Sequence, residues 1–225
     1  YGPSQALSLS YSSLETSATG RFGVGWQSNL TQYLTFDATD IVVWHRADGG
    51  RVPFGKVGGV WTAPGGHHET LSLSGSEYTV TTTDQTEYVF ESSGAGRLKR
   101  IENRFGKALT LAWSTSSATA TDASGRVMTL AIDSGNSRIT GVTDSAGRAW
   151  AFGYTGSGAA SQLTSVTDPA AKVTTLAYTS GLLTSVTRSR TKAAGGSDTI
   201  TWAVAYTSGR VASVTRIARG IPVGG

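Results

Sequence analysis

Apolar and polar residues alternate along most of this chain, in short runs separated by turn-forming residues. Five runs after residue 97 share a pattern in which two apolar residues enclose two others. They begin at Leu98, Ile139, Leu163, Leu183 and Val211. A fixed pattern of this length, repeated in order, is typical of proteins built from one repeated supersecondary unit.

Each of the first four runs is followed by an aromatic residue, at the same distance in three of them. Twelve residues lead from the second apolar residue to the aromatic in three units, and twenty in the fourth. The four aromatics are Trp113, Tyr154, Tyr178 and Tyr206. Each ends a strictly alternating apolar stripe, which predicts a strand with one buried face. Stacked units would therefore place these four aromatics in a continuous row that forms the core of the repeats.

Turn-forming residues lie between the two strands of each unit, at residues 103–106, 144–147 and 168–171. Each unit is therefore predicted to be a β-hairpin. The eight extra residues of the fourth unit fall in residues 189–197, which we expect to lengthen a turn. In the first strand the two apolar positions are three apart, and so lie on opposite faces unless a bulge intervenes; the sequence does not decide between these.

Other segments fit around this array. Residues 71–90 alternate and predict a hairpin that leads into the repeats, and residues 122–133 resemble a degenerate unit. Residues 1–70 do not repeat, and we expect them to cap the unpaired edge of the sheet. The sequence thus predicts an all-β protein of stacked antiparallel hairpins in a spiralling, open sheet, with a cap at 1–70 and repeats at 71–225.

Composition excludes several other classes. Only 15% of the residues are charged and 38% hydrophobic, and 29 are glycine, which argues against a helical bundle or coiled coil. The absence of cysteine excludes disulfides and thiolate chemistry. No run approaches the roughly 20 apolar residues of a membrane-spanning helix, so no transmembrane segment is expected. The chain starts without methionine or a signal peptide, and we expect it to be a processed piece.

The net charge of +4 is unevenly distributed. Residues 170–225 hold seven Lys or Arg residues and one acidic residue, Asp198. A basic surface attracts nucleic acid or anionic lipid, or it faces an acidic part of a longer protein. The arginines are dispersed among strand patterns, so no specific nucleic-acid partner is expected.

No set of residues predicts catalysis, a metal or a cofactor. His67, His68 and Glu69 form the only cluster of metal-binding types, but neighbouring residues of a strand point to opposite faces. His45 follows Trp44 in an alternating run and is expected to be a partly exposed strand residue. The remaining candidates fit turns better than a carboxylate pair or a phosphate loop; they are Asp37, Asp40, Asp48 and residues 55–59.

The repeat G-x-L-x-x-V-T-D-x-x-G-x-x-x-x-x-x-Y, closest at residues 139–154 and 163–178, resembles the RHS/YD repeat. Residues 76–113 are similar to the segment that precedes such repeats, and residues 11–13 and 20–26 to the start of many RHS regions. Some units depart from the pattern. Arg188 and Arg216 replace the turn aspartate, and Ala171 replaces the usual turn glycine.

The resemblance implies a spiralling sheet that closes, in long members, into a hollow non-enzymatic shell. Bacterial members enclose a C-terminal toxin, and animal relatives use a similar shell in adhesion receptors. We therefore expect part of a shell from a secreted or cell-surface bacterial protein. Its partners would be the rest of a longer polypeptide or a toxin cargo, with self-association through open sheet edges. The alternatives are a glycan- or receptor-binding module that uses Trp44 and Trp61, and, less favoured, a cell-envelope hydrolase.

Overall fold

The computed structural model is all-β, as the sequence predicts. It describes residues 2–3, 5–15, 20–37, 40–191 and 197–219. These residues form twenty strands and one short 3₁₀ turn, η1 (Gly158–Ala160). Within the same ranges, no helix combines the length and the apolar character needed to span a bilayer.

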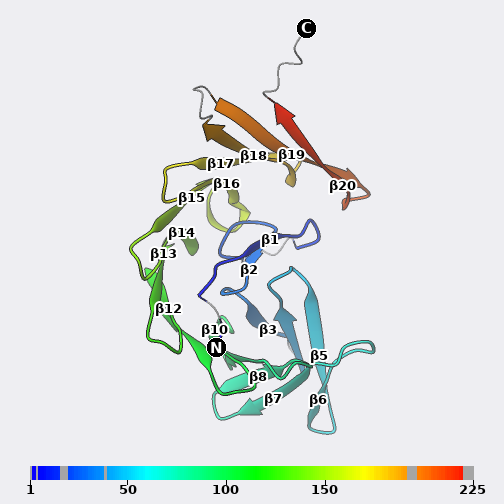
Figure 1. Cartoon of the computed structure of the whole chain (residues 1–225). Helices are drawn as coiled ribbons and strands as arrows, with labels where there is room; N and C mark the ends of the chain where they lie inside the picture. The colour runs from blue at the N-terminus through cyan, green and yellow to red at the C-terminus, as the bar shows by residue number, and fades with distance from the viewer. Residues whose placement is uncertain (1, 4, 16–19, 38–39, 192–196, 220–225) are drawn as a thin grey trace.

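Fourteen strands form one antiparallel sheet in which every strand pairs with its neighbours in sequence. They are β7 (Thr70–Ser74), β8 (Glu77–Thr81), β9 (Glu87–Glu91), β10 (Leu98–Glu102), β11 (Ala108–Trp113), β12 (Ser117–Thr121), β13 (Val127–Asp133), β14 (Arg138–Thr143), β15 (Ala149–Thr155), β16 (Gln162–Thr167), β17 (Val173–Thr179), β18 (Leu182–Thr191), β19 (Ser197–Thr207) and β20 (Arg210–Arg219). The sheet is open, with β7 and β20 at its two ends. Figure 1 shows that it curves into a crescent.

The N-terminal strands form two smaller sheets inside the curve of the crescent (Figure 1). One pairs β1 (Leu9–Tyr11) with β2 (Trp26–Ser28); the other contains β3 (Tyr33–Asp37), β4 (Ile41–His45), β5 (Arg51–Val57) and β6 (Val60–Thr62). We expected this region to cap an edge of the sheet. It lies along the concave face instead, and in the described sheet β7 and β20 each pair with one strand.

The predicted hairpins are present. The repeats form β10–β11, β14–β15, β16–β17 and β18–β19, and residues 71–90 form β7 to β9. Residues 122–133 belong to a complete hairpin, β12–β13. Ile132 pairs with Ile139 as Tyr154 pairs with Leu163, so Ile132 stands where other units have the aromatic. The large sheet starts at Thr70, beside the predicted boundary, although the division into domains remains a prediction.

Five hairpins share one turn, which accounts for the residues at these positions. In the turn after β14, Asp144 N donates to Arg148 O and Gly147 N donates to Asp144 O, both at 3.0 Å. Asp144 Oδ1 accepts from the backbone N–H of Ala146 and Arg148 at 2.9 Å. The fourth residue of each turn has positive φ; these residues are Gln85, Gly106, Gly125, Gly147 and Ala171. A three-residue loop that ends in a residue of positive φ is a common connection between antiparallel strands.

The prediction for the eight extra residues of the fourth unit is wrong in part. Residues 189–191 belong to β18, and Thr191 pairs with Ser197 of β19. The extra residues therefore lengthen both strands of the hairpin, whereas residues 192–196 lie outside the described part of the chain. Thr and Arg are acceptable in an exposed strand, so composition alone did not distinguish a longer ribbon from a longer loop.

The core lies on the concave side of the large sheet. In β11, Leu109 and Leu111 are buried while Thr110 and Ala112 are exposed. The buried stripes of the large sheet and apolar residues of the N-terminal sheets form one continuous cluster, in which the ring of Phe22 contacts that of Phe152 at 5.2 Å. The N-terminal segment therefore supplies the second layer that one curved sheet lacks.

Candidate functional site: the concave face and the open edge

The four predicted aromatics make the same contact in their units. Each donates a hydrogen bond from its indole N–H or its hydroxyl to a backbone carbonyl in the first strand of its own hairpin. The carbonyl belongs to the first of the two apolar residues in that strand. The pairs are Trp113 to Leu98 O (2.7 Å), Tyr154 to Ile139 O (2.6 Å), Tyr178 to Leu163 O (2.7 Å) and Tyr206 to Leu183 O (2.7 Å). We call these four contacts the aromatic latches.

The latches occur where the backbone pairing of each hairpin has ended. Pairing of β16 with β17 runs from Thr167 opposite Val173 to Ser165 opposite Thr175. Leu163 lies beyond this ladder, and the Tyr178 hydroxyl supplies a donor to its carbonyl. Because an unsatisfied buried carbonyl is costly, each latch replaces a backbone hydrogen bond with one from a side chain.

A bulge in each first strand places its two apolar residues on the same face of the sheet. Tyr154 pairs with Leu163 and Gly153 with Ser165, so Thr164 is the extra residue. Equivalent register shifts occur at Lys99, Thr140, Thr184 and Ala212. The bulge turns both apolar residues of a unit inward, and Ile139 and Val142 are both buried. Because a bulge bends its strand, five in equivalent places bend the sheet in one sense.

The aromatics form a row, but its rings do not touch. No ring contact in the described part of the chain joins two of the four latch residues, because an aliphatic residue lies between successive rings. Leu163, for example, pairs with Tyr154 and accepts from Tyr178. Burial raises the pKa of Tyr178 and of Tyr206 to about 12, so that both hydroxyls remain protonated donors at a higher pH than the hydroxyl of an exposed tyrosine.

The N-terminal segment is hydrogen-bonded along this row. Trp26 Nε1 donates to the Tyr178 hydroxyl at 2.8 Å, and Leu183 N donates to the Tyr11 hydroxyl at 3.1 Å. Val24 N donates to Ser161 O at 3.0 Å. Gly23, with φ of +92°, lies so close to the sheet that a Cβ atom would stand 2.8 Å from Ser161 O. Only glycine allows this approach.

A buried arginine fixes the same junction. Arg138, in β14, donates to Gly20 O, to Gly158 O at 2.9 Å and to Ser161 Oγ at 2.5 Å. Burial lowers the pKa of its guanidinium. Arg138 joins the N-terminal segment to η1 and to the loop before β16. The sequence offered no signal for this role, whereas Tyr11 and Trp26 stand in the motif that suggested the family resemblance.

His45 is buried, not partly exposed as we expected, with 5% of its surface accessible. Its Nε2 lies 3.1 Å from Thr35 Oγ1, its Nδ1 lies 3.5 Å from Glu15 Oε2, and the ring of Tyr33 stacks on it at 4.2 Å. Arg51 donates to Glu15 Oε1 at 2.6 Å. This polar cluster ties the chain before β2 to β3, β4 and β5.

Other candidate residues form local pairs. His67 Nδ1 lies 3.3 Å from Glu69 Oε2, and His68 N donates to the same oxygen at 3.1 Å. Across the described residues, no three His, Cys, Asp or Glu side chains gather in a metal-type cluster.

For the remaining candidates we expected turns. Asp48 Oδ1 accepts from Gly50 N within its predicted turn. Gly58 and Gly59 form the tight turn between β5 and β6. The turn predicted at residues 37–40 includes residues 38–39, which lie outside the described chain.

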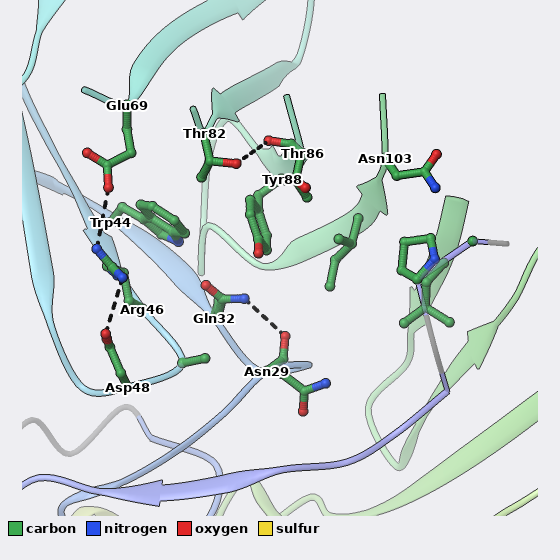
Figure 2. A pocket seen from close by; sticks show the side chains of 15 residues that line it. Asn29, Gln32, Trp44, Arg46, Asp48, Glu69, Thr82, Thr86, Tyr88 and Asn103 are labelled. Atoms are coloured by element: carbon green, nitrogen blue, oxygen red, sulfur yellow. Dashed lines mark hydrogen bonds and ion pairs between the residues drawn. The ribbon is translucent and has the colours of Figure 1, made fainter. Parts of the chain in front are cut away.

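A cavity of about 540 Å³ opens between the β4–β5 turn and β8 to β10 (Figure 2). Trp44 and Tyr88 pack with their ring centroids 5.2 Å apart. Arg46 lies between Glu69 and Asp48, at 3.4 Å and 3.2 Å. Trp44 is 3% exposed, so neither face of its ring is free to stack on a ligand. The cavity therefore has a polar rim whose charges are already paired.

At the other end of the large sheet, β20 pairs with β19 alone among the described strands. Val211 and Val214 correspond to Leu183 and Val186 in the preceding unit, yet they are 48% and 59% exposed. Leu183 is 4% exposed. In the other units the carbonyl at the position of Val211 accepts an aromatic latch. β20 therefore has the sequence and the bulge of a first strand, and its second side is unpaired within the described residues.

Residues 4–54 match a family model described as a domain of unknown function (DUF6531). The matched residues cover β1 to β4 and most of β5, which are the strands that line the concave face. No curated protein matches the chain.

Proposed function

We propose that this chain is a non-enzymatic structural module, one arc of an RHS/YD-type β-shell that encloses a cargo. The cargo in this proposal is a C-terminal toxin or another processed region of a secreted or cell-surface bacterial protein. The chain contributes a curved wall, and its partners are the rest of the shell and the enclosed cargo.

The observation that carries the proposal is the β20 edge. The residue at the first apolar position is buried in each of the four earlier units, whereas Val211 is 48% exposed. Val214 is 59% exposed, where its counterparts are buried or half-buried, as in a sheet that continues with another hairpin. Five equivalent bulges favour curvature in one sense, so added units extend the crescent instead of a flat sheet. A wall that curves in one sense suits the enclosure of a polypeptide.

Imaging of the complete gene product that contains this chain tests the proposal. Cryo-electron microscopy should show a hollow particle in which the density of this chain forms part of the wall, with additional density inside. A solid particle, or an extended rod with no lumen, would contradict the proposal. Limited proteolysis gives an independent measurement, since an enclosed cargo should resist a protease that cleaves the same cargo expressed alone.

The glycan-binding alternative receives less support. Trp44 is buried against Tyr88 and Arg46, and Trp61 packs on Tyr78 while Lys56 lies 5.3 Å from its ring. Stacking on sugars needs an open ring face, and these contacts occupy the rings. No specific observation favours the hydrolase alternative.

A further inference from the structure

A second cavity, of about 330 Å³, lies between β3 and the turn that precedes β10. Two guanidinium groups line it, those of Arg21 and Arg97, together with the apolar side chains of Leu34, Phe36 and Trp113. Its lining contains no carboxylate among the described residues. The cavity is separate from the polar one at Trp44 and from the β20 edge.

The two arginines differ in their partners. Arg97 forms a two-pronged ion pair with Glu91, with Nη2 at 3.0 Å from Oε1 and Nε at 3.0 Å from Oε2. The Arg21 guanidinium carbon lies 4.8 Å from the centroid of the Trp113 ring, and Nη1 lies 3.4 Å from Ser137 O. No carboxylate in the described chain comes within 4.0 Å of Arg21. Its positive charge is therefore not neutralised by a direct ion pair.

The surroundings make this charge unfavourable. Burial lowers the pKa of Arg21, and the positive charges of Arg97 and Arg138 lower it further, whereas Glu91 acts in the opposite direction. Arginine stays charged in proteins, so the protein bears this cost in the structure as it stands. An anion in the cavity would relieve it by pairing with the guanidinium in a site where water is partly excluded.

We propose that this cavity binds a monoanionic carboxylate carried on an apolar body, with Arg21 as the residue that pairs with the carboxylate. The planar fork of a guanidinium matches the two oxygens of a carboxylate. Phe36 and Trp113, which are both half-buried, offer apolar surface for the remainder of the ligand. Glu91 already neutralises Arg97, so the lining carries one unpaired positive charge, and a doubly charged group would be repelled by Glu91.

A titration with three small probes that share a benzyl group tests this site on the whole chain. Phenylacetate is the monoanion, phenylacetamide its neutral counterpart, and benzylphosphonate a dianion at pH 8. Binding is followed by NMR through the Trp113 indole N–H and the Arg21 Nε–H signals. For a ligand of this size we expect saturable shifts with phenylacetate and a dissociation constant of about 1–10 mM. Phenylacetamide should produce no saturable shift, and benzylphosphonate should bind at least 10-fold more weakly.

Substitutions separate the site from general charge effects. Arg21→Gln should weaken phenylacetate binding at least 10-fold, and Arg21→Lys should weaken it as well, because it keeps the charge but loses the fork. Arg104→Gln removes an exposed charge outside the cavity and should leave binding unchanged. If Arg21→Gln does not fold, the binding measurement on Arg21→Lys tests the proposal.

Three results would overturn the proposal. They are the absence of saturation with phenylacetate, equal binding of phenylacetamide, and unchanged affinity in both Arg21 variants. Tighter binding of benzylphosphonate than of phenylacetate would overturn the choice of a monoanionic carboxylate.

Discussion

At the scale of single residues, the aromatic latch gives four of the hairpins the same geometry. A ring that ends one strand satisfies a carbonyl in the strand before it, as Tyr178 does for Leu163 at 2.7 Å. The same hydroxyl accepts from Trp26 Nε1 at 2.8 Å. Tyr178 therefore serves both the repeat and the N-terminal segment, whereas among the described residues the Tyr154 hydroxyl bonds only to Ile139 O.

This difference predicts a graded effect of removing hydroxyls. Tyr154→Phe loses one hydrogen bond and should lower the free energy of unfolding by about 1 kcal/mol. Tyr178→Phe also leaves the Trp26 N–H without its acceptor, and should cost about 2–3 kcal/mol. Urea denaturation of both variants and the wild type measures the difference. Equal stability of all three proteins would show that the latches do not hold the strands.

The sequence predicted the position of the latch residues but not the bond they make. Their spacing from the turn marks one register and one face, which period-two alternation reveals. The bond depends on a bulge, at Thr164 in one unit. Threonine is common in regular strands, so its presence does not reveal the bulge. The burial of His45 was missed for a similar reason. Its partner Glu15 lies thirty residues earlier, and alternation describes only one strand.

At the scale of elements, five equivalent turns and five bulges set the path of the chain. The turn after β16 departs from the others because Ala171, at φ of +59°, occupies a position that is glycine in three of the other four. A residue with a Cβ atom is strained in this conformation. Residues 168–171 were correctly predicted as a turn, because aspartate and proline mark it even without the glycine.

The strain at Ala171 gives a prediction of unusual sign. Ala171→Gly should raise the free energy of unfolding by about 0.5–1 kcal/mol, because relief of strain exceeds the added chain entropy of glycine. The matched exchange, Gly147→Ala, places a Cβ atom in open space at φ of +78° and should lower stability by about 1 kcal/mol. Thermal unfolding of both variants measures the two effects. Shifts of the same sign would contradict the account.

At the scale of the whole molecule, the N-terminal segment and the large sheet depend on each other. The segment covers the concave face through Tyr11, Trp26 and the approach at Gly23, and the sheet alone would expose its apolar stripes. The sequence predicted an open, spiralling sheet but placed this segment at an edge. An edge is where a non-repeating region is usually needed, and contacts between segments more than 100 residues apart leave no local signal.

The central claim is that β20 is the first strand of a unit that continues. Amide hydrogen exchange of β20 measures this directly. In the isolated chain, the β20 amides that do not bond to β19 should exchange rapidly, because that edge faces solvent. In the complete gene product the same amides should be protected at least 100-fold by a following strand. Rapid exchange of these amides in both proteins would contradict the claim.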